Sequence, residues 1–256
     1  MLKYEAYTTM NYNISDSTFQ KIYTFLRTIS GIHTRNKEEI RIFLEAVCYL
    51  CRTGCQVRQL PRKYGNCFSI YQRFLRWKKK DIWRKMFQEF QDIDDEWFMI
   101  DGSVIRANQC AAGYKTGFKE NLGRSRGGFS TKIHALSDAL GNPVKFILSP
   151  GNEHDITHAE ELVKDLRNTK ILADKGYYSE KFAKFLKKND CEALIPSRSN
   201  SKKKRVFDKH IFRERHLIEN LFSKIKHFRR ISSRFCKTSS SFLSFLHFAG
   251  ALLWLR

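Results

Sequence analysis

Hydrophobic residues recur at helical spacing along roughly the first 90 positions of the chain. The pattern predicts one helix over 37–52, closed at Gly54, and another over 70–80, with the stretch 61–66 interrupting the shorter segments between them. The inner face of the second helix is formed by Tyr71, Phe74, Leu75 and Trp77. Short helices joined by tight turns, the last of them strongly basic, are typical of a helix-turn-helix module.

After the acidic segment 91–96 the pattern changes to strands alternating with helices. A strand is predicted over 96–104, followed by a hairpin of 130–136 with 144–148. Helices are predicted over 157–167, 179–189 and 208–229, and strands over 169–173 and 191–195. We read 113–128 as a glycine-rich, basic loop. The sequence therefore predicts a mixed α/β region over 94–256, preceded by a helical domain over 1–93 that binds DNA.

The last apolar stretch, 242–255, is too short for a membrane span. It covers about 14 residues, whereas a span needs roughly 20. We expect a buried terminal helix and no membrane partner.

Charge narrows the class of partner. The 256 residues contain 47 Lys and Arg against 26 Asp and Glu, a net charge of +21. Within 198–237, 14 basic residues face only Asp208, Glu214 and Glu219, and they alternate with apolar positions at helical spacing. A polyanion, most plausibly nucleic acid, suits this balance better than a small neutral substrate. Seven cysteines without a secretory signal favour a reduced, cytosolic chain.

Three carboxylates lie at positions in the predicted elements that indicate a chemical role. Asp101 interrupts a buried strand, Asp174 follows the strand at 171–173, and Glu219 lies at the edge of an apolar helix stripe. Each has a simple structural explanation, because Asp174 can start a turn and Glu219 can pair with Arg215. Together they supply the oxygen donors that Mg²⁺ prefers, and a pair of such ions supports phosphodiester chemistry.

Arg215, Glu219 and Lys226 are spaced by four and seven residues and so share one helix face. The two basic side chains can grip phosphates beside a metal, or they can form ion pairs on a solvated surface. Other predicted DNA contacts lie in the basic helix and in the glycine-rich loop: Arg73, Arg76, Lys78, Lys79, Arg124 and Arg126.

Further clusters have two interpretations each. Cys48, Cys51, Cys55 and Cys67 are candidate zinc ligands, since Cys48 and Cys51 have a suitable spacing. The first three also follow the apolar periodicity of a helix, which favours core positions. His154, Asp155 and His158 resemble a metal cluster, while Asp155 can instead cap a helix. The basic run 202–205 fits a nuclear-localisation signal or a phosphate-contacting loop.

Several motifs together resemble the DDE transposases of bacterial insertion sequences, of the insertion-sequence-five type. They are IDGSVIRA at 100–107, GRSRGGFSTKIH at 123–134, ADKGY at 173–177 and Arg215-x3-Glu219-x6-Lys226; LPRKYG at 60–65, YQRFLRW at 71–77 and Trp83 resemble the family's N-terminal DNA-binding region. The resemblance runs in one order from about residue 14 to the C-terminus. Phe212 stands where the family usually has Tyr, and Asn108 where relatives often have His.

The resemblance implies a ribonuclease-H-like catalytic fold over 94–256. It also implies that Asp101, Asp174 and Glu219 are the catalytic and metal-binding triad, and that Arg215 and Lys226 contact DNA. The expected enzyme uses Mg²⁺, with Mn²⁺ as a substitute, to cleave DNA at terminal inverted repeats and to join the 3′ ends to target DNA.

The expected setting is the bacterial cytoplasm, at the nucleoid, with a homodimer or higher oligomer on double-stranded DNA. Two alternatives stay open at this point. One is a ribonuclease-H-like nuclease without strand transfer, and the other is a DNA-binding regulator derived from a transposase.

Overall fold

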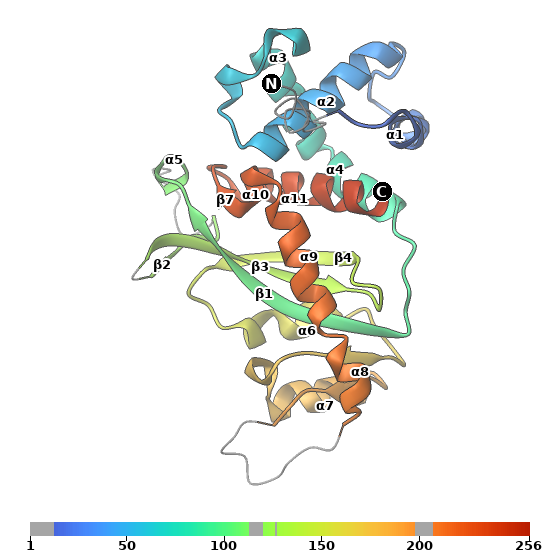
Figure 1. The fold of residues 1–256 in the computed structure, drawn as a ribbon, viewed down its shortest axis with the longest axis vertical. Coiled ribbons are helices and arrows are strands. Elements are labelled where there is room, and N and C mark those ends of the chain that lie inside the picture. The colour runs from blue at the N-terminus through green and yellow to red at the C-terminus, as the bar shows by residue number, and fades with distance from the viewer. Residues whose placement is uncertain (1–12, 113–119, 126, 198–206) are drawn as a thin grey trace, which may run out of the picture.

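The computed structural model describes residues 13–112, 120–125, 127–197 and 207–256 (Figure 1). Four helices come first: α1 (Asp16–Thr28), α2 (Lys37–Thr53), α3 (Cys67–Lys79) and α4 (Ile82–Glu89), with the 3-10 turns η2 (Val57–Gln59) and η3 (Arg62–Tyr64) between α2 and α3. The side chains of Ser15, Asn36 and Asn66 cap the first three helices. Gly54 closes α2 at φ +69°, a left-handed conformation that glycine adopts without strain. The predicted helical region is therefore confirmed.

A seven-stranded mixed sheet forms the centre of the rest of the described chain. Its strands are β1 (Trp97–Ala107), β2 (Gly123–Ser125), β3 (Gly128–Ser137), β4 (Pro143–Pro150), β5 (Lys170–Leu172), β6 (Glu192–Leu194) and β7 (Ser233–Arg234). The main order is β2-β3-β1-β5-β6, with β4 paired to β3 and β7 paired to β1. β1 runs antiparallel to β3 and parallel to β5 and β7. The mixed α/β class and the predicted β3–β4 hairpin are confirmed.

Helices cover both faces of this sheet (Figure 1). On one face lie α6 (Ala159–Val163) and α7 (Glu180–Lys188), packed against a cluster that includes Phe98, Ile100 and Leu136. On the other face lie α9 (His216–Lys226), which contacts β1 and β3, and α11 (Ser239–Trp254), which contacts β4. Two short helices, α5 (Gln109–Ala112) and α10 (Arg229–Ser232), complete this region.

The C-terminal helix α11 lies between the sheet and the N-terminal helices (Figure 1). The Phe245 ring stacks on Phe74 of α3 at 4.3 Å between centroids, and Phe248 packs edge-on against Trp83 of α4 at 5.4 Å. The Cys51 thiol of α2 contacts the backbone carbonyl of Phe245 at 3.9 Å. Buried residues of the helical region and of the sheet face therefore belong to one hydrophobic core. No helix among the described residues is long and apolar enough to cross a membrane.

Three sequence predictions of secondary structure were wrong in detail. The predicted helix over 208–229 is divided into α8 (Lys209–Arg213), α9 and α10. The break arises because the backbone N–H groups of Arg215 and Leu217 bond carbonyls three residues back, which tightens the turn. The predicted helix over 157–167 consists of a 3-10 turn, η5 (Asp155–His158), and the one-turn helix α6. The predicted loop over 113–128 contains β2, because 123–125 pairs with β3.

Candidate active site

The sheet brings two of the predicted carboxylates to the same level. Met99 of β1 pairs with Leu172 of β5 in a parallel register, so Asp101 and Asp174 each lie two residues beyond a paired position. On its other side, Asp101 pairs with Ala135 of β3. Adjacent parallel strands thus present both carboxylates at one edge of the site.

The Asp101 side chain is 23% exposed and has two polar contacts. Its Oδ1 accepts a hydrogen bond of 2.7 Å from the Gly102 backbone N–H, and its Oδ2 lies 3.4 Å from Nη1 of Arg215. The pKa of Asp101 is raised to about 6, mainly by burial. The Gly102 N–H and Arg215 lower this pKa, and the charges of Asp174 and Asp155 raise it. The negative charge at this carboxylate is thus incompletely compensated.

Asp174 begins a tight turn. It is the N-cap of the 3-10 turn η6 (Lys175–Tyr177), and its Oδ1 accepts a 2.8 Å hydrogen bond from the Gly176 N–H. The structural interpretation of this residue is confirmed. The same contact fixes the direction of this half-buried carboxylate, which lies at the same edge of the sheet as Asp101.

Arg215 joins the first and third carboxylates. It lies at the N-cap of α9, where its guanidinium contacts Glu219 on the same helix and Asp101 on β1. The predicted i,i+4 ion pair with Glu219 is therefore present. Because Glu219 is 56% exposed, that pair contributes little to stability. The contact between Arg215 and Asp101 is the one that joins the start of α9 to the centre of the sheet.

The residues at this site are of the type that binds a hard divalent cation, but they are not arranged as a preformed metal site. Among the described residues, no group of three or more His, Cys, Asp or Glu side chains is close enough together to hold a metal ion. The donors are carboxylate oxygens, which Mg²⁺ and Mn²⁺ favour. Arg215 compensates the negative charge of Asp101 only in part, and the remaining negative charge fits a cation.

The basic residues of α3 that were predicted to contact DNA differ in their exposure and in their contacts within the protein. Arg76 and Lys79 are exposed on α3. Arg73 is half-buried, with its guanidinium 5.2 Å from the centroid of the Phe43 ring. Lys78 turns toward α11, where its Nζ contacts the Ser241 hydroxyl at 3.2 Å. The predicted basic exterior of α3 therefore consists of fewer free cations than its sequence suggests.

The predicted DNA contacts in the second half of the chain come from several separate elements. Lys226 is exposed on α9 and Arg124 is exposed on β2, whereas Arg126 and the run 202–205 lie outside the described residues. Phe212 packs edge-on against Phe207 at 5.2 Å between ring centroids. Asn108 accepts a hydrogen bond from the Cys110 N–H.

Sequence reasoning missed one exposed aromatic residue near the basic helix. Phe68, in the first turn of α3, is 59% exposed, and the Arg58 guanidinium lies 6.0 Å from its ring centroid. The signal was available, because Phe68 is out of step with the buried positions Ile70, Phe74 and Trp77.

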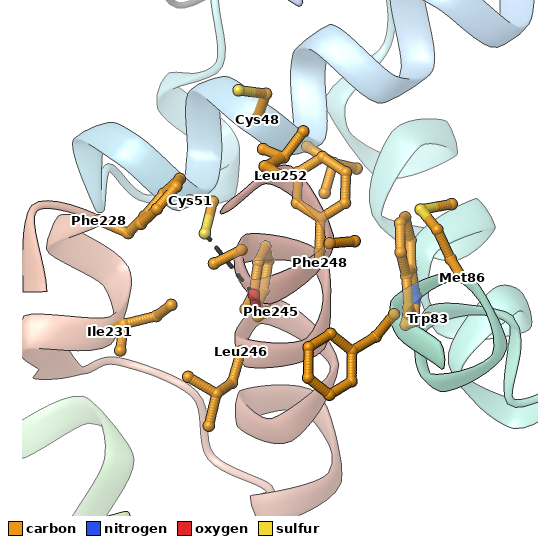
Figure 2. Close-up of a cluster of buried hydrophobic side chains, with 14 of the residues drawn as sticks. Cys48, Cys51, Trp83, Met86, Phe228, Ile231, Phe245, Leu246, Phe248 and Leu252 are labelled. Atoms are coloured by element: carbon orange, nitrogen blue, oxygen red, sulfur yellow. Dashed lines mark hydrogen bonds between the residues drawn. The ribbon is translucent and has the colours of Figure 1, made fainter. Parts of the chain in front are cut away.

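Asp155 was predicted either to join His154 and His158 in a metal cluster or to cap a helix, and both predictions were wrong. The N-cap of η5 is His154, and no side chain caps that turn. His158 bonds to Glu153 at 2.7 Å instead of joining a metal cluster. Cys48 and Cys51 are buried among apolar side chains, as the periodicity predicted (Figure 2).

Two family models match the chain. Residues 94–255 match the "Transposase DDE domain", and residues 14–87 match the "Putative transposase of IS4/5 family". A Brucella ovis protein named "Putative transposase for insertion sequence element IS6501" is 35% identical over 130 residues, which cover 50% of this chain and 99% of that protein. The Burkholderia cepacia "Putative transposase for insertion sequence element IS402" is 26% identical over 135 residues, covering 48% of this chain and 62% of that protein.

The fold is similar to that of a solved structure. The piggyBac transposase, in a synaptic complex with hairpin DNA, aligns with a TM-score of 0.53 and 13% sequence identity over 94% of this chain and 70% of its own. This match, together with the mixed sheet and its flanking helices, identifies the fold of the second region as ribonuclease-H-like.

Proposed function

The chain belongs to the DDE transposase family, and from that premise we propose that it cleaves DNA at the terminal inverted repeats of its own mobile element and joins the 3′ ends to target DNA. Asp101, Asp174 and Glu219 are the proposed catalytic residues. The bound partner is double-stranded DNA, and action on two element ends requires at least a dimer on that DNA.

One observation carries the assignment of the site. Arg215 contacts both Asp101 and Glu219, although 114 residues separate Arg215 from Asp101 in the sequence. A purely structural pair on the α9 surface would not need to reach the middle of β1. The contact supports a shared role for carboxylates that come from a strand and a helix.

Asp101, Asp174 and Glu219 would hold Mg²⁺ in this proposal, with Mn²⁺ as a substitute. Two such ions, when bound, activate the attacking water or 3′ hydroxyl and stabilise the leaving oxygen. The chain's own residues prepare for this. The Gly102 and Gly176 N–H groups orient Asp101 and Asp174, and Arg215 offsets the repulsion between carboxylates before a cation binds.

DNA recognition falls to α3 in this proposal, with Lys226 and Arg124 contacting phosphates near the site. Phe68, Gln72 and Arg76 are exposed and recur every four residues, so they form one stripe along the helix. Gln and Arg make bidentate contacts with adenine and guanine, and an apolar ring contacts the thymine methyl group. We assign this stripe to the reading of base edges in the terminal repeats.

Single substitutions of the carboxylates test the proposal. Asp101→Ala, Asp174→Ala and Glu219→Ala should each abolish cleavage of a DNA fragment that carries an element end, while binding to that fragment persists. Asp165→Ala provides a matched control, because Asp165 is an exposed carboxylate paired with Lys145. Normal cleavage by the Glu219→Ala protein would contradict the assignment.

A strand-transfer assay separates the remaining alternatives. A transposase joins the cleaved 3′ ends to a second DNA, a nuclease of the same fold cleaves without joining, and a transposase-derived regulator binds without either step. Joining that depends on all three carboxylates is the expected result.

A further inference from the structure

Asp155 lies against the strand that carries Asp101. A Cβ atom built on Gly102 would lie only 2.1 Å from Asp155 Oδ1, so the carboxylate occupies the space that a side chain would take at position 102. Successive residues of a strand point to opposite faces. Asp155 therefore supports β1 from the face opposite to the Asp101 side chain.

Lys132 holds this carboxylate in place. Its Nζ lies 3.1 Å from Asp155 Oδ1 and donates a 2.7 Å hydrogen bond to the Glu153 backbone carbonyl. The Lys132 side chain is 10% exposed, and its Cδ would lie 3.3 Å from a Cβ on Gly102. The Asp155 side chain is 35% exposed, so solvent screens this ion pair in part, though less than a pair in which both side chains are exposed. Lys132 and Asp155 together pack on the backbone of Gly102.

Two buried polar groups lie close to the same carboxylate. His134 Nδ1 is 3.6 Å from Asp155 Oδ1 and has no hydrogen-bond partner among the described residues. The Tyr177 hydroxyl lies on η6, which contacts η5; it is buried and has no hydrogen bond among the described residues. Burial raises the pKa of Tyr177, and the negative charge of Asp155 raises it as well. Buried polar atoms without hydrogen-bond partners are costly and uncommon, and these two lie on the same side of β1 as Asp155.

We propose that Asp155, clamped by Lys132, is a positioning residue that fixes Asp101 through the backbone of Gly102. The Gly102 N–H is the group that orients Asp101 Oδ1, so a shift of this backbone would turn the carboxylate away. The inference rests on the proposed role of Asp101 as a metal ligand. Groups that orient metal ligands typically change metal affinity by 10–100-fold when they are removed.

Mn²⁺ binding to the full-length protein tests this inference without relying on activity. The signal of free Mn²⁺ in electron paramagnetic resonance gives the affinity, and melting temperature monitors the fold. Asp155→Ala and Lys132→Met should each weaken Mn²⁺ binding about tenfold. Asp155→Asn keeps the shape but loses the ion pair, so its loss should be smaller. The control Asp165→Ala should bind Mn²⁺ as the wild type does.

A second-site variant separates positioning from a charge effect. Gly102→Ala should weaken Mn²⁺ binding because its methyl group collides with Asp155. Adding Asp155→Ala opens that space, so the double variant should bind Mn²⁺ more tightly than Gly102→Ala alone. The inference is overturned by wild-type affinity in both Asp155→Ala and Lys132→Met. Tighter binding in Lys132→Met would also overturn it, because the pair would then act through charge.

Asp101→Ala distinguishes a failure of this inference from a failure of the proposed function. If Asp101→Ala binds Mn²⁺ as the wild type does, the metal site itself is misassigned. If Asp101→Ala abolishes Mn²⁺ binding while Asp155→Ala and Lys132→Met leave it unchanged, the metal site stands and only the positioning role of Asp155 is refuted.

Discussion

Deletion of residues 1–93 should prevent stable folding of the region that carries the carboxylates. The reason is the position of α11, which buries Phe245 against Phe74. It also buries Phe248 against Trp83 (Figure 2). Both Phe245 and Phe248 are 0% exposed in the full chain. A fragment over 94–256 would leave these rings without their partners.

The cost can be worked out from these contacts. Uncovering a buried phenylalanine costs about 1.5–3 kcal/mol, so the two rings account for about 3–6 kcal/mol. The buried Arg230 also donates hydrogen bonds to the Leu50 and Cys55 carbonyls of the N-terminal region, and two bonds from a charged donor contribute about 3–6 kcal/mol. A total of about 6–12 kcal/mol is comparable with the whole stability of a typical domain, about 5–15 kcal/mol.

Thermal unfolding followed by circular dichroism, together with binding of a dye specific for exposed apolar surface, measures the effect. The fragment should bind the dye and lose its cooperative transition, whereas the full chain keeps it. Replacing Phe245 and Phe248 by Gln in the fragment should reduce dye binding, which shows that α11 is the exposed surface. A fragment that melts cooperatively near the temperature of the full chain would refute the reasoning. DNA-end recognition is therefore better tested with point variants in the intact chain.

Three further predictions follow from individual side chains. Arg76→Ala should weaken binding to DNA ends and lower its salt dependence, as measured by a titration in increasing salt, whereas Lys78→Ala should change it little because Lys78 contacts α11. Arg234 is fully buried and donates to backbone carbonyls, so Arg234→Met should destabilise the protein by about 3–5 kcal/mol in denaturant unfolding, and Lys should not rescue it. Burial lowers the pKa of His247 from 6.5 to about 4, so its neutral form stabilises the fold above pH 6.5 and this contribution, at most about 3 kcal/mol, is lost as the pH falls toward 4. His247→Phe should flatten the pH dependence of stability in that range, and an unchanged slope would contradict the assignment.

Local patterns were enough to predict the elements whose ends have a local cause. The α2 helix ends at Gly54 because glycine tolerates a positive φ, and a glycine at the end of an apolar periodic segment already predicts a helix end there. The β3–β4 hairpin follows from two apolar runs around a turn that contains Gly141, which has φ +78°. The carboxylates Asp101 and Asp174 were predicted as candidates because each interrupts or directly follows a buried strand.

Local sequence patterns could not predict contacts between segments that are distant in the sequence. Nothing near Asp155 in the sequence indicates that its carboxylate packs on Gly102, because the partner strand is about fifty residues away. The break between α8 and α9 was missed for a similar reason. The apolar spacing continues through 208–229, whereas the turn at Arg215 depends on backbone hydrogen bonds that the spacing does not reveal. Periodicity reports which face of an element is buried, but not which element covers it.

The net charge of +21 overstates how much of the surface is available to DNA. Arg230 and Arg234 are buried and donate to backbone carbonyls, and Lys78 contacts α11. Arg215 offsets the charge of Asp101 and Glu219 at the proposed active site. A basic side chain that already has an internal partner would have to give up that contact before it could neutralise a phosphate. The number of phosphates neutralised, as measured by the salt dependence of binding, should therefore be well below the number expected from composition.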